Sequence, residues 1–231
     1  MHHGTHTDIL IVSDIHLGSP VCRSKALLRF LKTVKFRTLI LNGDIFDDLN
    51  FNRLSHDDWE LLAHLRELSK LNHHTAVIWI AGNHDGAAAT LSRLIGVPVV
   101  NEYVFYWNGT KCLAIHGHQF DRFLSKNIVI STIAGAIYLA IQRIDGQEQH
   151  VARLVKRFSK SWLRVSAKVM KGAVRYNLVF KRAAYVFCGH THKEHEEVVH
   201  GVEYLNSGCW TDIPSAYITL DEQGARVHTI G

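Results

Sequence analysis

The sequence predicts an α/β fold with a helical insertion, and two patterns support this. Short runs rich in Val, Ile and Leu, with the length and composition of buried strands, alternate with segments whose apolar residues recur at helical spacing. Residues 120–182 interrupt this alternation, because helical patterns occupy most of that stretch. We therefore predict a core of residues 1–119 and 183–231, with residues 120–182 forming a helical cap insertion over it.

Length and composition agree with this organisation. The 231 residues suit one domain with an insertion, and a hydrophobic fraction of 47% supports a sizeable core. The four cysteines contain no CxxC pair, which favours reduced thiols in a cytosolic protein. No apolar signal-peptide segment precedes the first strand, and the longest apolar run, residues 128–141, is shorter than the ~20 residues of a membrane-spanning helix. We therefore expect a cytoplasmic location.

The expected elements follow one another along the chain. Buried strands are expected at residues 8–12, 38–41, 76–80, 112–115 and 184–188. Apolar residues at helical spacing predict helices at residues 23–35, 57–71 and 87–94. A short strand pair is expected over residues 97–107, before a turn at Asn108-Gly109. An antiparallel finish is expected from strands at residues 196–199, 202–206, 217–220 and 226–230.

Each of the five buried strands runs directly into a polar cluster, usually with a glycine that lets the backbone turn tightly. The clusters are Ser13-Asp14-Ile15-His16, Asn42-Gly43-Asp44-Ile45-Phe46-Asp47, Gly82-Asn83-His84-Asp85, His116-Gly117-His118 and Gly189-His190-Thr191-His192. One such cluster is usually an ordinary turn. Five in succession indicate a site, because α/β proteins place their chemistry outside the carboxyl ends of their strands.

The side chains collected in this way are carboxylates, imidazoles and one amide, with no thiolate among them. This mixture suits Mn²⁺, Fe or Zn²⁺ rather than a cysteine-rich structural zinc site. There are too many candidate ligands for one ion. Two ions about 3.5–4 Å apart that share a carboxylate would use them all, and such a pair activates a bridging hydroxide for displacement at phosphorus.

These motifs, DxH, GDxxD, GNHD, GH and GHxH in this order, resemble those of the calcineurin-like metallophosphoesterases. The resemblance extends from Asp14 to His192 and implies a four-layer αββα sandwich with two divalent cations, Mn²⁺ by the habit of the family. It implies that the first cation is held by Asp14, His16, Asp44 and His192. It implies that Asp44 bridges to a second cation held by Asn83, His116 and His190.

The same resemblance implies that His84 protonates the leaving oxygen or stabilises the transition state, and that Asp47 orients His84. Holding such an acid in one tautomer and rotamer is sound on physical grounds. Other polar residues near the motifs receive ordinary structural roles. Asp85 is expected to cap the following helix, Asp48 to be solvated, and three histidines to be surface or supporting groups: His118, His195 and His200.

The predicted cap carries an unusual charge pattern. Residues 151–185 contain ten basic side chains and no acidic one, so the rest of the chain carries a net charge of −5 against a total of +5. An apolar helix beside this cationic segment favours a substrate that is both anionic and lipid-like, or a membrane surface that holds one. The alternative is that the apolar helix is core and the basic face is solvated.

Within the superfamily, the segments SDIHLGS and YLNSGCWTDIPSAYITLDEQG resemble those of the UDP-2,3-diacylglucosamine pyrophosphohydrolases of lipid A synthesis. That resemblance implies hydrolysis to UMP and 2,3-diacylglucosamine 1-phosphate at the cytoplasmic face of the inner membrane. Candidate contacts to the diphosphate or sugar are Arg122, Lys126, Arg157, Lys160 and Arg164. The chain departs from that group at His84 and Cys209, where its best-known members carry Arg and relatives commonly carry Asp.

Two other functions remain open at this stage. One is a soluble phosphodiesterase or phosphatase that acts on nucleotides or other phosphoesters. Nucleic acid is not favoured as a partner, because Val, Leu and Phe interrupt the basic segment. The other is a non-catalytic scaffold, which is disfavoured because such a protein is expected to have lost ligands. The oligomeric state cannot be read from the sequence.

Overall fold

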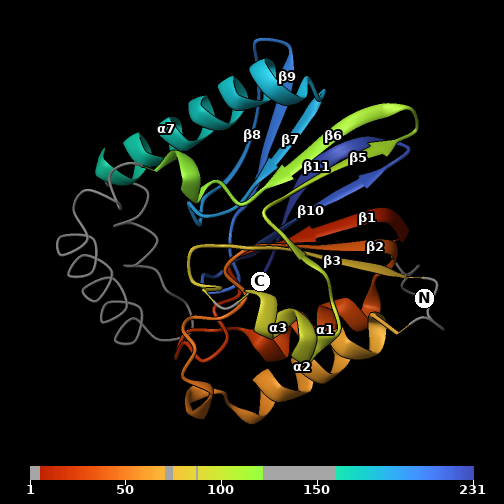
Figure 1. Ribbon diagram of the computed structural model, residues 1–231, viewed down its shortest axis with the longest axis vertical. Helices are drawn as coiled ribbons and strands as arrows, with labels where there is room; N and C mark the ends of the chain where they lie inside the picture. The colour runs from red at the N-terminus through yellow and green to blue at the C-terminus, as the bar shows by residue number, and fades with distance from the viewer. Residues whose placement is uncertain (1–5, 71–74, 87, 122–159) are drawn as a thin grey trace.

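The computed structural model describes residues 6–70, 75–86, 88–121 and 160–231. Two sheets lie face to face, with helices on both outer faces (Figure 1). The predicted four-layer αββα sandwich is confirmed. Positions 1–5, 71–74, 87 and 122–159 lie outside the described residues.

The first sheet has six strands in the order β11-β10-β1-β2-β3-β4. Their bounds are β1 His6–Val12, β2 Lys35–Asn42, β3 Ala76–Ile80, β4 Val99–Val100, β10 Ser215–Asp221 and β11 Gly224–Ile230. The four strands β1 to β4 are parallel, whereas β10 and β11 add an antiparallel edge. The parallel strands therefore end on the same side, where the first three polar clusters follow β1, β2 and β3.

The second sheet has five strands in the order β5-β6-β7-β9-β8. Their bounds are β5 Glu102–Trp107, β6 Thr110–Ile115, β7 Tyr185–Cys188, β8 Glu194–Val199 and β9 Val202–Ser207. Strands β6, β7 and β9 are parallel, and β5 and β8 pair antiparallel at the two edges. The fourth and fifth polar clusters follow β6 and β7, so they join the first three at one end of the sandwich.

Apolar side chains fill three layers. The contact between the sheets includes Ile11 and Ile40 from the first and Phe187 and Leu205 from the second. The helices α1 Ser24–Thr33, α2 His56–Leu68 and α3 Ala88–Ile95 cover the outer face of the first sheet, with leucines facing inward as predicted. A box of reciprocal hydrogen bonds between Ser55 and Asp58 starts α2.

The helix α7, Lys160–Tyr176, covers the outer face of the second sheet and continues into a π-helical turn, Asn177–Lys181. Val169, Ala173 and Val174 are buried against Leu113 and Val186 of β6 and β7. Because β6 and β7 are parallel neighbours, their connection must cross the sheet, and a helix packed on its face is the usual solution. The second half of α7 thus belongs to the sandwich, although the sequence assigned it to the cap. The central part of the predicted cap lies outside the described residues.

The expected strand pair over residues 97–107 was wrong in its pairing. Strand β4 joins β3 in the first sheet, whereas β5 forms a hairpin with β6 in the second through the Asn108-Gly109 turn. The chain therefore crosses between the sheets at Asn101. All four cysteines have free thiols, and Cys112, Cys188 and Cys209 are buried. Among the described residues, no helix combines the length and apolar character needed to cross a membrane.

Candidate metal centre

The backbone of the loops that follow the strands is unusual. Asp14, His16, Asp44, His190 and His192 have φ angles of 52°, 53°, 52°, 67° and 51°, in the left-handed region that residues other than glycine seldom adopt. Such conformations cost about 1–3 kcal/mol each and persist where the surrounding structure imposes them, most often at functional sites. The strain falls on five of the residues that the sequence predicts as metal ligands.

Hydrogen bonds between the first two loops hold these residues in place. Asp14 N–H donates to Gly43 O at 2.9 Å, Ile15 N–H to Asp44 O at 2.9 Å, and His16 N–H to Asp44 O at 3.1 Å. These bonds continue the β1–β2 pairing beyond the strands. They place Asp14 and His16 beside Asp44.

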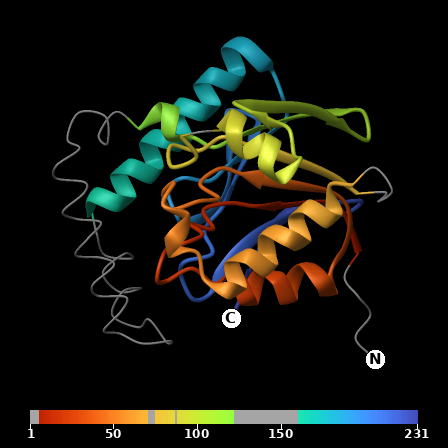
Figure 2. The same cartoon turned by 60° about the horizontal axis from the view of Figure 1, so that its bottom comes forward.

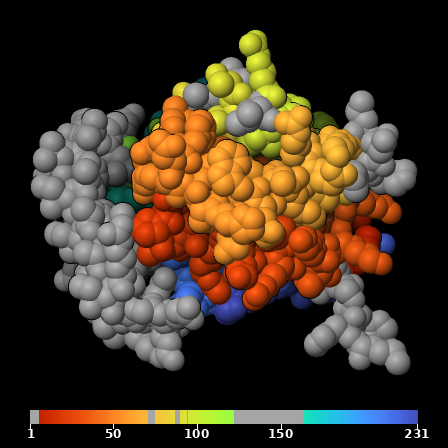
Figure 3. Space-filling view, turned by 90° about the horizontal axis from the view of Figure 1, so that it is seen from below, coloured from red at the N-terminus to blue at the C-terminus, as the bar shows by residue number. Residues whose placement is uncertain are grey.

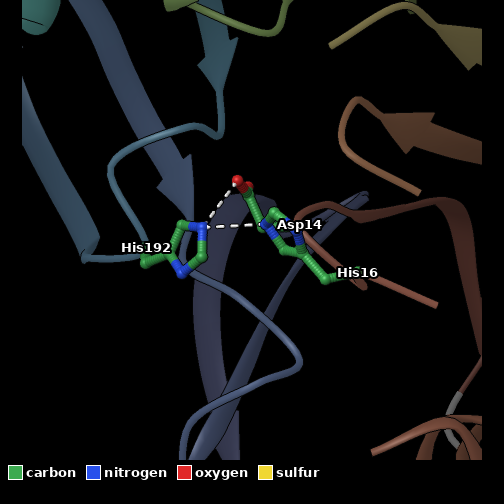
Figure 4. A group of neighbouring side chains, drawn as sticks. All are labelled: Asp14, His16 and His192. Carbon is green, nitrogen blue, oxygen red and sulfur yellow. Dashed lines mark hydrogen bonds and ion pairs between the residues drawn. The ribbon is translucent and has the colours of Figure 1, made fainter. Parts of the chain in front are cut away.

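One group of candidate ligands consists of Asp14, His16 and His192 (Figure 4). His192 Nε2 lies 3.2 Å from Asp14 Oδ1 and 3.1 Å from His16 Nε2. One ligand atom from each residue lies within 4.8 Å of the other two. Asp14 and His16 are buried, and three donor atoms converge on one point between the loops after β1 and β7.

A second group consists of Asp44, His116 and His190. His116 Nδ1 donates to Asn42 O at 2.7 Å, and this bond aims Nε2 at Asp44 Oδ2, 3.2 Å away. The same Oδ2 atom lies 4.0 Å from His16 Nε2 of the first group. Asp44 therefore stands between the two groups, in the position that a shared carboxylate requires.

The residues present fit a pair of divalent cations. Asp14 Oδ1 and His116 Nε2, one in each group, are buried and make no hydrogen bond of good geometry, although each lies 3.2 Å from an oppositely charged neighbour, His192 and Asp44 respectively. Buried polar atoms of this kind are costly unless an ion or another partner satisfies them. The oxygen and imidazole donors suit a first-row divalent cation. The structure therefore offers two adjoining candidate metal sites.

The protonation of the site without cations supports this fit. Burial alone would raise the pKa of the Asp44 carboxyl, but the adjacent His116 and His16 hold it well below its ordinary value. Burial opposes protonation of His116, but Asp44 and Asp14 raise the pKa of His116 to about 9. Burial likewise opposes protonation of His192, whose pKa Cys209 and Asp14 raise well above its ordinary value. Neighbouring groups thus keep protons on His116 and His192, whereas burial lowers the pKa of His190.

His84 and Asp47 lie beside His16 in a third group. The His84 ring centroid is 4.9 Å from that of His16, and His84 Nδ1 donates to Asp47 O at 2.6 Å. The Asp47 carboxylate points elsewhere, toward His16 Nδ1 at 3.4 Å and Arg53 Nη2 at 2.8 Å. The predicted contact between His84 and Asp47 therefore exists, but it is made by the backbone carbonyl rather than by the carboxylate.

Two glycines at the loops are required by close packing around the ligands. A Cβ atom on Gly82 would collide with the Asp44 side chain and backbone N. A Cβ atom on Gly43 would collide with the His116 ring, and Gly43 also has a φ of +89°. The glycines of the GD and GNHD motifs thus let the loops approach the candidate ligands closely.

Asp85 has a different role from the predicted helix cap. Its Oδ1 atom accepts the N–H groups of Ile45 and Phe46 at 3.0 and 3.2 Å, and Oδ2 accepts Trp79 Nε1–H and Gly82 N–H at 3.1 and 2.9 Å. The carboxylate is buried, with 1% of the residue exposed. Asp85 therefore ties the loop after β2 to the end of β3.

Asp121 contacts the site although the sequence analysis did not select it. Its Oδ2 atom lies 3.2 Å from His190 Nε2, and the residue is buried. A carboxylate that orients a metal-binding imidazole is a common supporting contact. The only signal in the sequence is its position, five residues after His116.

The structure describes some of the other predicted site residues and not others. Asn83 is exposed in the loop between Gly82 and His84, and Arg164 is exposed on α7. Lys160 begins α7, but its side chain is not described, and Arg122, Lys126 and Arg157 lie outside the described residues. The roles of these residues stay predictions.

The histidines that were expected to be supporting groups differ in their surroundings. His118 is half-buried beside His116, and burial together with His116 lowers the pKa of His118 to about 4. His195 lies 2.9 Å from the exposed Glu197, outside the candidate site.

Comparison with known sequences shows the family of this chain. The profile of the calcineurin-like phosphoesterases matches residues 7–194, which is more than half of the chain. The chain belongs to the calcineurin-like phosphoesterase family. The two groups of candidate ligands agree with the dinuclear metal site that this family uses. No curated protein sequence matches the chain.

Solved structures agree with this fold. An archaeal phosphodiesterase is 16% identical with a TM-score of 0.54, and the match covers 96% of this chain and 99% of that one. YfcE, a phosphoesterase from E. coli, is 18% identical with a TM-score of 0.52, and the match covers 96% of each chain. At these identities the likeness shows the calcineurin-like phosphoesterase fold alone.

Proposed function

We propose that this protein is a metal-dependent hydrolase that cleaves a phosphoester or diphosphate bond. One observation carries the proposal: two groups of candidate ligands, all buried or half-buried, adjoin at Asp44. Two divalent cations bound there would supply Lewis acidity to the phosphoryl oxygens and lower the pKa of the attacking water. The scaffold alternative loses support, because the described structure brings six of the seven predicted ligands together.

The proposed ligand roles follow the two groups. Asp14, His16 and His192 hold one cation, His116 and His190 hold the other, and Asp44 faces both. Asn83 is proposed as a further ligand from its place in the GNHD motif. Asp47 is proposed to orient His16, because its carboxylate faces His16 Nδ1. Asp121 is proposed to orient His190 in the same way.

His84 is proposed as the residue that protonates the leaving oxygen. Its Nδ1–H is held by the carbonyl of Asp47, so Nε2 is the nitrogen that can carry the transferred proton. The side chain is exposed at the edge of the metal centre, where a substrate can reach it. A positioned acid of this kind contributes roughly 10²–10⁴-fold to a rate.

We further propose that the substrate is a lipid-linked nucleotide, UDP-2,3-diacylglucosamine, and that the protein works at an anionic membrane surface. The support comes from the sequence: the SDIHLGS and YLNSGCWTDIPSAYITLDEQG segments, and the ten basic residues of 151–185 with no acidic one. A cationic segment with apolar side chains favours an acylated anion. Mn²⁺ is proposed as the metal because three of the seven proposed ligands supply oxygen, no thiolate is among them, and the family habitually uses it.

The test is hydrolysis by the Mn²⁺-supplemented protein of three substrates: UDP-2,3-diacylglucosamine, a deacylated UDP-sugar and bis-p-nitrophenyl phosphate. Release of UMP from the acylated substrate alone supports the lipid-linked nucleotide. Hydrolysis of the simple diester with the lipid ignored supports a general phosphodiesterase instead. If none of the three substrates is hydrolysed, the proposal that the protein is a hydrolase is refuted.

Variants connect the reaction to the site. His84→Ala is expected to lower kcat by roughly 10²–10⁴-fold without loss of bound metal. The matched control is His195→Ala, because His195 pairs with Glu197 away from the ligands. Full activity in His84→Ala would overturn the role proposed for His84.

A further inference from the structure

A cavity of about 500 Å³ lies between the first turns of α1 and α2. These two helices run side by side on the outer face of the first sheet and begin at the end of the molecule that carries the candidate metal centre (Figures 1 and 2). In the space-filling view, the surfaces of these two segments, red and orange, adjoin on one face (Figure 3). The cavity has the volume of a site for a small molecule.

The cavity adjoins the metal centre through two of its lining residues. Gly18 is two residues beyond the candidate ligand His16, on the same loop. Arg53 lines the cavity and forms an ion pair with Asp47, whose other carboxylate oxygen faces His16. The Arg53–Asp47 ion pair and the loop from His16 to Gly18 thus connect the cavity with the candidate metal centre.

One side of the cavity favours negative charge. Arg23, Lys25 and Arg53 line it, although Arg53 is already paired with Asp47 and Asp48, and Arg23 donates to Asp212 O and Ser215 Oγ. The first turn of α1 carries no acidic residue and no side-chain cap. At this helix start the Ser24 N–H already faces the Cys22 sulfur, so the attraction for an anion comes from Lys25 and the positive end of the helix. The start of α2 is different, because Ser55 and Asp58 cap it and Asp57 and Asp58 offset its positive end.

The opposite side offers hydrogen-bond acceptors. Asp57 and Asp58 line the cavity; Asp58 is buried, its Oδ2 atom accepts Ser55 N–H at 2.8 Å, and its carboxylate also faces the Cys22 thiol. Ser19, Ser24 and Ser55 add hydroxyl groups to the wall. A free anion such as phosphate gains nothing from the carboxylates. A group that carries both a phosphate and sugar hydroxyls can use both sides, because the hydroxyls donate hydrogen bonds to carboxylate oxygens.

We propose that this cavity holds the part of the substrate that is not attacked, and that it selects a phosphorylated sugar or nucleoside. The inference rests on the proposed hydrolase function, because it assigns a second binding region to the same substrate. One phosphoryl group lies at the cations, and the adjoining phosphate and sugar lie between Lys25 and Asp57. The cavity then distinguishes nucleotide-like substrates from simple phosphodiesters.

Lys25 is the residue that tests this, because it is exposed on the first turn of α1 and lies outside the metal centre. Lys25→Glu reverses its charge. Lys32→Glu is the matched control, since Lys32 is exposed on the last turn of the same helix and does not line the cavity. The assay measures inhibition of bis-p-nitrophenyl phosphate hydrolysis by UDP and by inorganic phosphate.

UDP is expected to inhibit the wild type more strongly than inorganic phosphate does. Lys25→Glu should weaken inhibition by UDP about tenfold, the loss of one charge-assisted contact. Inhibition by phosphate should change less than about twofold, and Lys32→Glu should change neither constant beyond that. Equal losses for both inhibitors, or for both variants, would overturn the inference and leave the hydrolase proposal intact.

If the wild type hydrolyses none of the three substrates, the hydrolase proposal fails. Equilibrium dialysis with UDP then tests separately whether the cavity binds a nucleotide. Tight binding that Lys25→Glu weakens and Lys32→Glu does not would support the cavity. Absence of that difference would refute it.

Discussion

Replacing Asp85 by Asn tests the hydrogen bonds that join the loops beneath the metal centre. The buried carboxylate of Asp85 accepts four N–H groups, two on each oxygen. The amide of Asn has nearly the same shape but only one accepting oxygen. Two of the four donors would therefore lose their acceptor and face an NH₂ group instead.

The magnitude follows from those two bonds. A hydrogen bond to a charged group contributes about 1.5–3 kcal/mol, so the loss of two such bonds gives about 3–6 kcal/mol. Burial and the nearby Asp44 raise the pKa of Asp85, so removal of its charge offsets part of this, and Asp85→Asn should lower the free energy of unfolding by about 2–4 kcal/mol. That is a large share of the roughly 5–15 kcal/mol that stabilises an ordinary domain. The change should also weaken metal binding, because Gly82 and Ile45 flank the residues that hold the cations.

Urea unfolding of the metal-free protein is the appropriate assay, since bound metal would add its own binding energy to the stability. Asp48→Asn is the control, because it makes the same chemical change on an exposed residue that pairs with Arg53. It should lower the free energy of unfolding by less than about 1 kcal/mol. A loss below about 1 kcal/mol for Asp85→Asn as well would refute the role assigned to this carboxylate.

Two further results are expected. Gly82→Ala should lower the affinity for Mn²⁺ by roughly 10–100-fold, because the added Cβ would displace Asp44. Gly86→Ala should leave the affinity unchanged, because its Cβ would meet open space. Titration calorimetry measures both affinities, and equal values would contradict the packing argument. Metal binding at pH 7 should release protons, because the metal-free protein is protonated at His116, whose pKa is raised to about 9, and at His192, whose pKa is raised well above its ordinary value. Calorimetry in buffers of different ionisation enthalpy counts the released protons. A count near zero would contradict the assignment.

The sequence predicted the strands and the site for one physical reason. Parallel strands end at the same edge, so polar residues that follow buried apolar runs must come together. That reasoning anticipates Asp14, Asp44 and His116 without knowing the contacts. The roles of bridging ligand and proton donor came from the family resemblance rather than from spacing.

Pairing between strands was harder to predict. Alternation and composition show that residues 99–107 are extended, but they do not show which sheet receives each strand. The same limit applies to α7, whose amphipathic pattern shows an apolar face without naming its partner. In the structure that partner is the outer face of β6 and β7.

The contacts that support the ligands could not be predicted, because they join residues distant in sequence. Asp85 bonds the N–H groups of Ile45 and Phe46, about forty positions earlier, and Asp121 reaches His190, 69 positions later. Asp47 shows the same limit at close range. The motif places it near His84, but only the fold determines that its carbonyl, and not its carboxylate, makes the contact.

The most direct test of the dinuclear centre is a titration of the metal-free protein with Mn²⁺, with bound ions counted per chain. Two adjoining sites that share Asp44 predict two ions per chain in the wild type, and a loss of tight binding at both sites in Asp44→Asn. One ion per chain in the wild type, or two ions still bound tightly in Asp44→Asn, would contradict a shared carboxylate at the centre of the site.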